Sequence, residues 1–556
     1  MKKLLARFSF LGLFIISSIT LLNSCVNNDD LSITEPTRYT AQDIQSYSDL
    51  FDVFWTVMDQ RYNYFYEQKR RDGMDWSAIY REYSPKFKAL KTFGRATENQ
   101  EIISEDYTKA RQYFEEIIDP IIDKHFGVSI SMPETNSGTN VTTTFSGGMT
   151  NTVYPNSFFF NIKNDYMKDR ISSDSFTSSN LLIRGYLNSN PDIYYFAFNS
   201  FELTREFYIE FDDKYLSPDK GNRSILTPEI IDKNTALNAI SNPETRKKVR
   251  DFTVNILNQW NEYPKSEEVA SFNREVTKFK NTEVVTDELL ELSETLIKKS
   301  NELIDYRSMS TYSSVLTPET QQYIYFFIGL MNTHVIQGYR LEHFLTASQN
   351  FLIKAPFYKQ FLNPLHKGEI KKLILDLRGN IGGHVVDARF FSDRFITKNE
   401  IFGYQRTKEG NGRFNYTPWV EAKTKLHKFG IPANIPITIL TDNSSASMSE
   451  LTTLMLKSQG NHVISIGDYS SGATAGLGES DDFNGGIRDV VAGRLTFTMP
   501  VMAFKDAKGE VIEGIGIKPD IYVAPLTDEE FDQMFQSIDT FVDRVLNEAI
   551  KYLSSK

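Results

Sequence analysis

The sequence has almost no cysteine and few histidines, and these shortages exclude whole classes of site. Its 556 residues contain one cysteine, Cys25, and seven histidines. A single cysteine excludes an intrachain disulfide, a CxxC redox pair and any zinc or iron–sulfur site built on several cysteines. None of the histidines lies in an HxxxH or HExxH pattern, so we predict neither a metal site nor a cofactor.

An excess of positive charge is also missing. Lys and Arg number 61 against 72 Asp and Glu, which gives a net charge of −11. Such a chain has no broad basic surface to neutralise a phosphate backbone, so nucleic acid is not an expected partner. The composition is otherwise ordinary, with 40% hydrophobic and 24% charged residues, and at this length it predicts two or more domains.

The N-terminus lacks the run of about 20 apolar residues that a membrane-spanning helix needs. Lys2, Lys3 and Arg7 instead precede a shorter apolar stretch over 8–22 that Ser and Thr interrupt, which is typical of a secretory signal. The stretch ends at Cys25 in a sequence that resembles the lipobox of bacterial lipoproteins. We therefore expect cleavage after residue 24 and a lipid on Cys25; an uncleaved anchor with a free thiol is the alternative.

The residues after Cys25 extend this prediction to the protein's location. Asp29 and Asp30 resemble the export signal of surface lipoproteins. The predicted location is the bacterial cell envelope, as an outer-membrane lipoprotein on the periplasmic face or the cell surface. The membrane would then be a partner through the N-terminal lipid.

Composition and periodicity also predict the domain organisation. Apolar residues recur at helical spacing near the start of the folded chain, whereas 132–192 is rich in Thr, Ser, Asn and Gly, which favours strands and loops. The predicted segments are a signal peptide (1–24), a flexible tether (25–42), a helical N-terminal domain carrying His125 (43–131), a β-rich region that could be a degenerate PDZ module (132–204), a mostly helical insertion (205–340), an α/β core (341–525) and a C-terminal helix (526–556).

Two strand–turn–helix units in the predicted core favour a parallel sheet with crossover helices. The first runs from an apolar strand over 373–377 into the glycine turn 378–383. Such a turn leaves N–H groups free to bind an anion or oxyanion, although a plain tight turn is the alternative. The second runs from a strand over 435–440 into the serine-rich 441–450, where a serine could be a nucleophile or only a cap.

Together these units resemble the C-terminal-processing (tail-specific) serine protease family. The resemblance implies an α/β fold with a Clp-protease/crotonase-like core and parallel-sheet crossovers, joined to a helical N-terminal domain and a helical insertion. It also implies a polypeptide as the substrate. The residues that carry it are Asp376-Leu377-Arg378-Gly379-Asn380-x-Gly382-Gly383, Ser445-Ala446-Ser447-Met448-Ser449-Glu450, Gly467-Asp468-x-Ser470-x-Gly472, Asp123-Lys124-His125 and Gly514-Ile515-Gly516-Ile517-Lys518-Pro519-Asp520.

By this resemblance the nucleophile is Ser447, with Ser444, Ser445 and Ser449 as competing candidates. The oxyanion hole would consist of the backbone N–H of Met448 and one from Gly382 or Gly383. Both the fold and the oxyanion predictions require that the turns 376–383 and 441–450 lie side by side at one edge of the sheet.

The resemblance offers two kinds of general base. In the bacterial tail-processing branch a lysine follows the third strand, but the matching position here is Ala473, and Lys457 is expected to be a solvated surface residue. The tricorn-like branch uses a histidine from the N-terminal domain, and His125 and Glu513 match its positions. A neutral imidazole with a pKa near 6.5 suits proton removal at neutral pH.

Three other residues affect the choice of His125 as the base. Lys124 stands where the tricorn-like pattern has a serine, and Phe126 stands where a small hydroxyl residue is common. Lys124 would lower the pKa of His125 if their charges approach. His384, directly after the glycine turn, is the rival base.

The predicted function is an exported, lipid-anchored serine endopeptidase of the tail-specific type. It would hydrolyse peptide bonds through an acyl-enzyme on Ser447, with His125 as base and then acid and Glu513 orienting or polarising. The alternative is an inactive family member that serves as a peptide- or ligand-binding surface lipoprotein.

Overall fold

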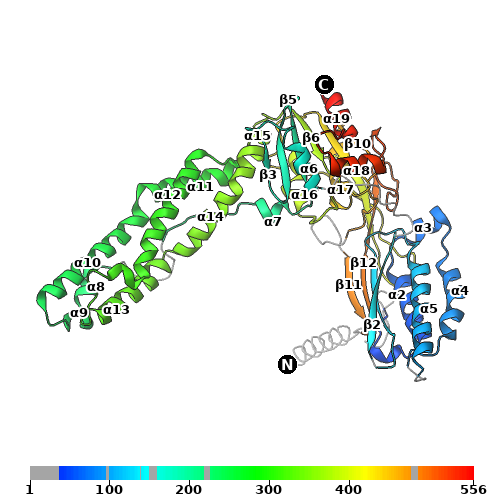
Figure 1. Cartoon of the computed structure of the whole chain (residues 1–556), viewed down its shortest axis with the longest axis horizontal. Helices are drawn as coiled ribbons and strands as arrows, with labels where there is room; N and C mark the ends of the chain where they lie inside the picture. Colours follow the sequence, from blue (N-terminus) through cyan, green and yellow to red (C-terminus); the bar gives the residue numbers. More distant parts are fainter. Residues whose placement is uncertain (1–36, 95–98, 138, 149–159, 218–225, 477–485) are drawn as a thin grey trace, which may run out of the picture. The chain divides into compact units, whose positions relative to one another are not determined.

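The computed structural model describes residues 37–94, 99–137, 139–148, 160–217, 226–476 and 486–556 (Figure 1). The predicted signal peptide and Cys25 lie outside these residues. The chain divides into an N-terminal unit (Met1–Thr152, Tyr404–Val420 and Ala475–Lys505) and a core unit (Val153–Gly403, Glu421–Thr474 and Asp506–Lys556). No helix in the described part of the chain combines the length and the apolarity that crossing a membrane requires.

The N-terminal unit combines helices with an antiparallel sheet. Side chains of Ser46, Asp75 and Asn99 accept hydrogen bonds from first-turn N–H groups and so fix where three of the helices begin. Aromatic rings fill the space between the helices; Phe51 stacks on Phe87 with ring centroids 4.7 Å apart. The helices are η1 (Ala41–Asp43), α2 (Tyr47–Arg61), α3 (Phe65–Asp72), α4 (Trp76–Ala89) and α5 (Gln100–Ile118). The sheet has the order β11-β12-β1-β2, with β1 (Gly127–Pro133), β2 (Asn140–Ser146), β11 (Gly486–Val491) and β12 (Leu495–Pro500).

The core unit is built on a seven-stranded sheet with the order β14-β10-β9-β6-β5-β4-β3. The strands from β5 to β14 pair in parallel, and β4 and β3 add antiparallel strands at one edge. Its central strands are buried apolar runs, as expected for a sheet covered on both faces. The strands are β3 (Thr177–Ser178), β4 (Leu182–Leu187), β5 (Asn190–Phe198), β6 (Lys372–Asp376), β9 (Ile437–Thr441), β10 (Val463–Gly467) and β14 (Ile521–Tyr522). A separate three-stranded sheet has the order β13-β7-β8, with β7 (Ile401–Thr407), β8 (Val420–Lys423) and β13 (Met502–Asp506).

Helices α17 (Met448–Lys457) and α19 (Arg544–Ser554) lie on opposite faces of the seven-stranded sheet. Leu546, Ala549 and Leu553 of α19 belong to the same buried cluster as Ile466 of β10. Ser465, the neighbour of Ile466 in the strand, points to the other face and accepts a hydrogen bond from Lys457 Nζ of α17 (3.0 Å). The shorter helices of the core unit are α6 (Phe160–Met167), α7 (Leu203–Phe207), α16 (Asp387–Phe390), η7 (Ser392–Phe395) and α18 (Asp528–Gln536).

A helical arm interrupts the core unit between β5 and β6. Figure 1 shows its long helices running alongside one another, and α12 contacts both α11 and α14. Phe272 of α11 and Phe344 of α14 meet edge to face at 5.4 Å. The elements of the arm are α8 (Pro228–Asp232), α9 (Thr235–Asn238), α10 (Pro243–Glu262), η2 (Tyr263–Lys265), α11 (Glu267–Thr282), α12 (Asp287–Ile304), η3 (Asp305–Arg307), η4 (Met309–Tyr312), α13 (Gln321–Met331), η5 (Asn332–Ile336), α14 (Leu341–Phe357), η6 (Tyr358–Leu362) and α15 (Asn363–His366).

The predicted fold class is confirmed: the chain is mixed α/β, with parallel strands, a helical N-terminal region and a helical insertion. One boundary differs from the prediction. The sheet of the core begins with β3, β4 and β5, well before residue 341, because β5 pairs in parallel with β6 from Ile193 to Ala197. The predicted β-rich region 132–204 is thus divided between two sheets, since β1 and β2 belong to the N-terminal unit.

Candidate active site

Ser447 lies between β9 and α17 in an uncommon backbone conformation, with φ 55° and ψ −116°. A residue with a Cβ adopts this region only at a cost of about 1–3 kcal/mol, and such strain clusters at functional sites. Ser447 is the N-cap of α17, so it lies at the positive end of the helix dipole. Its N–H donates to the carbonyl of Ala473 (2.9 Å) and to Glu450 Oε2 (3.1 Å), which holds the strained residue in place.

The glycine turn after β6 lies directly against Ser447, as the sequence required. Because β6 and β9 are parallel neighbours, the turns that follow them meet at the same edge of the sheet. The N–H of Ala446 donates to the carbonyl of Asn380 (3.1 Å). Gly382 has φ +93°, and a Cβ on it would lie 2.6 Å from the Cβ of Ser447. Only glycine permits this approach.

The two candidate glycine donors differ in what their N–H groups do. The N–H of Gly382 donates to Asn380 Oδ1 (2.9 Å), so it is already engaged. No hydrogen bond among the described residues uses the N–H of Gly383 or that of Met448. Gly383 is exposed, whereas Gly382 is buried. The pair of N–H groups available to an oxyanion is therefore that of Met448 and Gly383.

Two of the three competing serines, Ser445 and Ser449, have structural partners. Ser445 is fully buried, and its Oγ donates to the carbonyl of Leu377 (2.8 Å). Ser449 is also fully buried, and its Oγ donates to the carbonyl of Asn380 (2.8 Å) and to Asn380 Oδ1 (2.9 Å). Both hydroxyls thus join the two turns to each other, while Ser447 is partly exposed.

Glu450 holds the start of α17 to the segment after β10. Its carboxylate is fully buried and accepts hydrogen bonds from Ser470 Oγ (2.6 Å), Gly472 N (2.7 Å) and Ala473 N (2.8 Å). Burial raises the pKa of Glu450, and these hydrogen bonds act in the opposite direction. The sequence identified Glu450 only as a marker for the serine, and the structure adds this anchoring role.

Glu513 lies on the loop between β13 and β14 and is fully buried. Its Oε2 accepts two hydrogen bonds from Thr474, one from the backbone N–H (2.7 Å) and one from Oγ1 (2.9 Å). The next residue, Gly514, donates its N–H to the carbonyl of Gly472 (2.6 Å). Glu513 is thus fixed beside the segment whose Ala473 carbonyl holds Ser447, and Thr474 is a partner that sequence reasoning missed.

A buried network of charged side chains holds the start of the glycine turn. Arg378 donates to Asp376 Oδ2 (2.7 Å) and to both carboxylate oxygens of Asp543, the N-cap of α19 (2.8 Å each). Lys163 is buried against Asp376 and the carbonyl of Arg378. Burial alone would raise the pKa of Asp376, but the positive charges of Arg378 and Lys163 hold it well below its usual range.

Neither lysine position supplies a base for Ser447. Ala473 is buried and carries no titratable group. Lys457 Nζ is engaged by Asp520 (2.9 Å) and Ser465 (3.0 Å). Lys457 was expected to be a solvated surface residue, but its side chain is only 22% exposed because these partners hold it against the sheet.

His125 belongs to the N-terminal unit and lies in the connection between α5 and β1. Its backbone N–H donates to Asp123 Oδ1 (2.8 Å), and Asp123 is fully buried. Among the described residues, His125 Nδ1 and Asp123 Oδ2 are buried atoms with no hydrogen-bond partner. Burial raises the pKa of Asp123 and lowers that of His125 to about 4. Burial, and not Lys124, is thus the cause of the shift at His125.

Two other residues that the sequence analysis singled out are Phe126, which is buried in the core, and His384, which is exposed to solvent. Phe126 is a core side chain that meets Tyr62 edge to face at 6.1 Å, which explains why no hydroxyl residue stands there. The side chain of His384 is exposed, and its backbone N–H donates to the carbonyl of Phe201 (2.8 Å). Within either unit taken alone, the described residues contain no set of three His, Cys, Asp or Glu side chains close enough to share a metal ion.

Comparison with known proteins agrees with this arrangement. Residues 344–523 match the model of peptidase family S41. The carboxy-terminal processing protease CtpB of Bacillus subtilis (strain 168) is 30% identical over 137 residues, which is 25% of this chain; the match spans about a quarter (26%) of that relative's length. These two matches support a relationship of this chain to peptidase family S41.

Two solved structures are also similar. One is the structure of mature CPAF complexed with lactacystin, at 8% identity and a TM-score of 0.43 over 93% of this chain and 99% of that one. The other is the photosystem II D1 C-terminal processing protease, at 18% identity and a TM-score of 0.22 over 34% of this chain and 42% of that one.

Proposed function

We propose that the chain is a serine endopeptidase of the tail-specific type that hydrolyses polypeptides through an acyl-enzyme on Ser447. The observation that carries the proposal is the strained Ser447 at the start of α17, packed against the glycine turn after β6. A nucleophile held at a helix N-terminus beside free backbone N–H groups is the arrangement that acyl transfer requires. The match of this segment to peptidase family S41 supports the same reaction.

In the proposed reaction Ser447 Oγ attacks the scissile carbonyl carbon and His125 accepts the hydroxyl proton. The carbonyl oxygen becomes an oxyanion that the N–H groups of Met448 and Gly383 bind. The imidazolium then returns the proton to the leaving amine as the C–N bond breaks, and the acyl group stays on Ser447. In the second half His125 takes a proton from water as the water oxygen attacks the acyl carbon. The imidazolium then returns this proton to Ser447 Oγ as the ester bond breaks, which releases the acid product.

We propose a histidine base of the kind that the tricorn-like branch uses. This choice rests on the two lysine positions, neither of which offers a base to Ser447: Ala473 stands at one, and Lys457 is ion-paired with Asp520. Glu513, fixed by Thr474, is proposed to orient or polarise the imidazole.

Labelling with a fluorophosphonate probe tests the proposal directly. We expect one mole of probe per mole of protein, on the tryptic peptide that contains Ser447. Labelling on a different residue, or none under conditions in which the protein is folded, would instead favour the inactive binding protein.

The state of His125 predicts how activity depends on pH. The neutral imidazole accepts the proton, so the reaction is lost as pH falls through the pKa of His125, which burial lowers to about 4. We therefore expect kcat/KM to remain near its plateau at pH 6 and to fall with a midpoint near pH 4. The rate of fluorophosphonate labelling, measured in short pulses across pH, reports this midpoint. A midpoint at pH 6.5–7 would contradict a buried histidine base.

Gly382→Ala is expected to disrupt the site because the added methyl group would clash with Ser447 and Met448. The new Cβ would lie 2.6 Å from Ser447 Cβ and 2.9 Å from Met448 N, so the two turns must separate. We expect a loss of roughly 10²–10³ in kcat, which is the effect of removing one oxyanion donor. Gly73→Ala is the matched control, because Gly73 has a similar φ of +81° and no atom within 4 Å of its Cβ position. If both variants lose activity equally, contact with Ser447 is not the cause.

We also propose that the protein is an envelope lipoprotein held by a lipid on Cys25. The proposal rests on the sequence of the N-terminus, which lies outside the described residues. Wild-type protein is expected to incorporate radiolabelled palmitate and to enter the detergent phase in Triton X-114 partitioning. Cys25→Ser should lose both properties, and palmitate incorporation by this variant would refute the assignment.

A further inference from the structure

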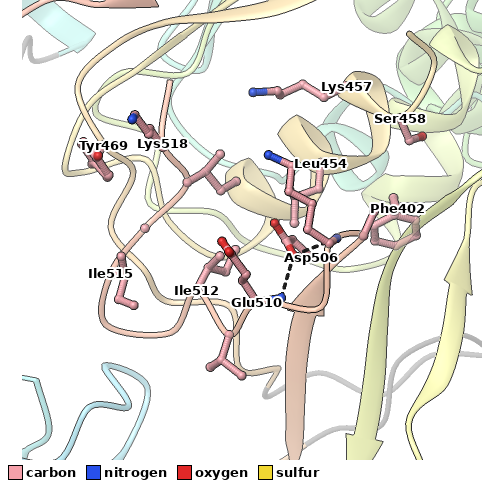
Figure 2. A pocket seen from close by; sticks show the side chains of 15 residues that line it. Phe402, Leu454, Lys457, Ser458, Tyr469, Asp506, Glu510, Ile512, Ile515 and Lys518 are labelled. Carbon is pink, nitrogen blue, oxygen red and sulfur yellow. Dashed lines mark hydrogen bonds between the residues drawn. The ribbon is translucent and has the colours of Figure 1, made fainter. Parts of the chain in front are cut away.

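A cavity of about 760 Å³ lies beside α17, where Leu454, Lys457 and Ser458 line it (Figure 2). Ligand pockets in proteins have volumes of about 300–1,000 Å³, so the cavity has the size of a binding site. All the residues that line it belong to the core unit. At 1.5 Å per residue along a helix, Leu454 lies roughly 10 Å along α17 from Ser447. A ligand in this cavity would therefore be outside the reach of the serine hydroxyl.

The walls of the cavity are mainly apolar. Figure 2 shows Leu454 of α17 on one side and the loop that carries Ile512 and Ile515 on the other, with Phe402 of β7 at one end. Val511 and Ile517 also line it. Ile515 is 51% exposed, which leaves an apolar side chain open to solvent at the edge of the cavity. Apolar side chains of a ligand would be buried against these groups.

The charged groups at the cavity divide into paired and unpaired ones. Lys457 is engaged by Asp520 and Ser465, and Asp506 Oδ1 accepts the backbone N–H groups of Lys508 (3.0 Å) and Glu510 (2.8 Å). The side chains of Lys508, Lys518 and Glu510 are different. Within the described part of the chain they take part in no ion pair and no side-chain hydrogen bond, and all three residues are exposed. Both signs of charge are thus free at the edge of one apolar cavity.

We propose that this cavity binds a short apolar peptide as a zwitterion. The peptide's side chains occupy the apolar walls, its carboxylate pairs with Lys508 and Lys518, and its ammonium group pairs with Glu510. The unpaired charges select this occupant: a fatty acid would leave Glu510 without a partner, and an uncharged apolar compound would use none of the three. The site is distinct from the proposed catalytic residues and does not depend on their activity.

Isothermal titration calorimetry of the full-length protein with trileucine tests the proposal. The Ser447→Ala protein serves as the background, so that no peptide is consumed and the result does not depend on the proposed peptidase activity. We expect saturable binding with one site. Ile515→Asp and, independently, Leu454→Arg should each weaken it at least tenfold, because they place a charge in the apolar lining. Ile353→Asp, which alters a side chain 75% exposed on α14, should leave the affinity unchanged.

The charges are tested with modified ligands. N-acetyl-trileucine amide lacks both terminal charges and should bind about five- to tenfold more weakly, since exposed ion pairs each contribute modestly. Decanoate should fail to displace trileucine. Equal binding by the blocked peptide, stronger binding by decanoate, or full affinity in both the Ile515→Asp and the Leu454→Arg proteins would each overturn the proposal. Because Ile515 is exposed, its substitution is not expected to disturb folding.

Discussion

Replacing Ser447 by alanine is expected to lower kcat on an unfolded protein substrate by roughly 10⁴- to 10⁶-fold. Removal of the nucleophile from a catalytic unit of this kind abolishes the acyl-enzyme route and leaves only the contribution of the oxyanion hole and of binding. The substitution removes one oxygen atom and keeps the Cβ, so α17 and the glycine turn should remain in place. Initial rates with fluorescently labelled casein, measured for wild type and variant side by side, give the ratio.

Two further variants show whether the loss is chemical. Ser447→Gly should be as inactive as Ser447→Ala but more stable, because φ 55° and ψ −116° cost glycine little. Ser444→Ala alters a half-buried neighbour in the same turn and should keep activity within about threefold. Residual activity above a thousandth of wild type in Ser447→Ala would mean that another residue is the nucleophile.

Arg378→Met is expected to have the largest effect on stability. Arg378 is 5% exposed and joins Asp376 to Asp543. Its loss would leave Asp376 with Lys163 and the hydroxyl of Tyr195, and Asp543 with the N–H of Leu546, so two buried carboxylates would share one cation. Breaking such a buried network by removing one partner costs about 3–5 kcal/mol. Because α19 and the glycine turn are both held by Arg378, we expect the site to unfold at lower urea concentration and labelling of Ser447 to be lost with it. The measurement is the urea dependence of fluorophosphonate labelling, which reports on the site itself.

Arg544→Met is the matched control for this variant. Arg544 pairs with Glu530 at 2.8 Å, but both side chains are about one third exposed, so the loss should be under about 1 kcal/mol. An equally small change in Arg378→Met would show that the buried network does not support the site.

The sequence predicted the parts of the core that depend on local pattern. Buried apolar strands followed by a glycine turn and a serine turn indicated parallel neighbours, and β6 and β9 are such neighbours. What the pattern could not predict is which polar groups satisfy one another. The joining of Ser449 Oγ to Asn380, and the anchoring of Glu450 by Ser470, Gly472 and Ala473, depend on contacts between segments far apart in the chain.

The pairing of β5 with β6 is another contact that the local sequence does not predict. The apolar run over 193–198 is typical of a buried strand, but nothing local indicates that its partner lies beyond a long helical segment. The burial of His125 is likewise a tertiary effect. Its identity could be read from the sequence, whereas the lowering of its pKa follows from burial that the sequence does not show.

The position of the helical arm has a consequence for folding. The chain must complete everything between Phe198 and Lys372 before β5 can meet β6, and at a synthesis rate of about 5–20 residues per second this takes roughly 10–35 seconds. Until then the apolar strand β5 can pair with β4 but lacks its parallel neighbour β6. Closing so long a loop as random coil would also carry a large entropic cost. Helices that form early and pack on one another would bring the ends of the arm together and reduce that cost, so the arm would act as an internal folding aid for the sheet it interrupts.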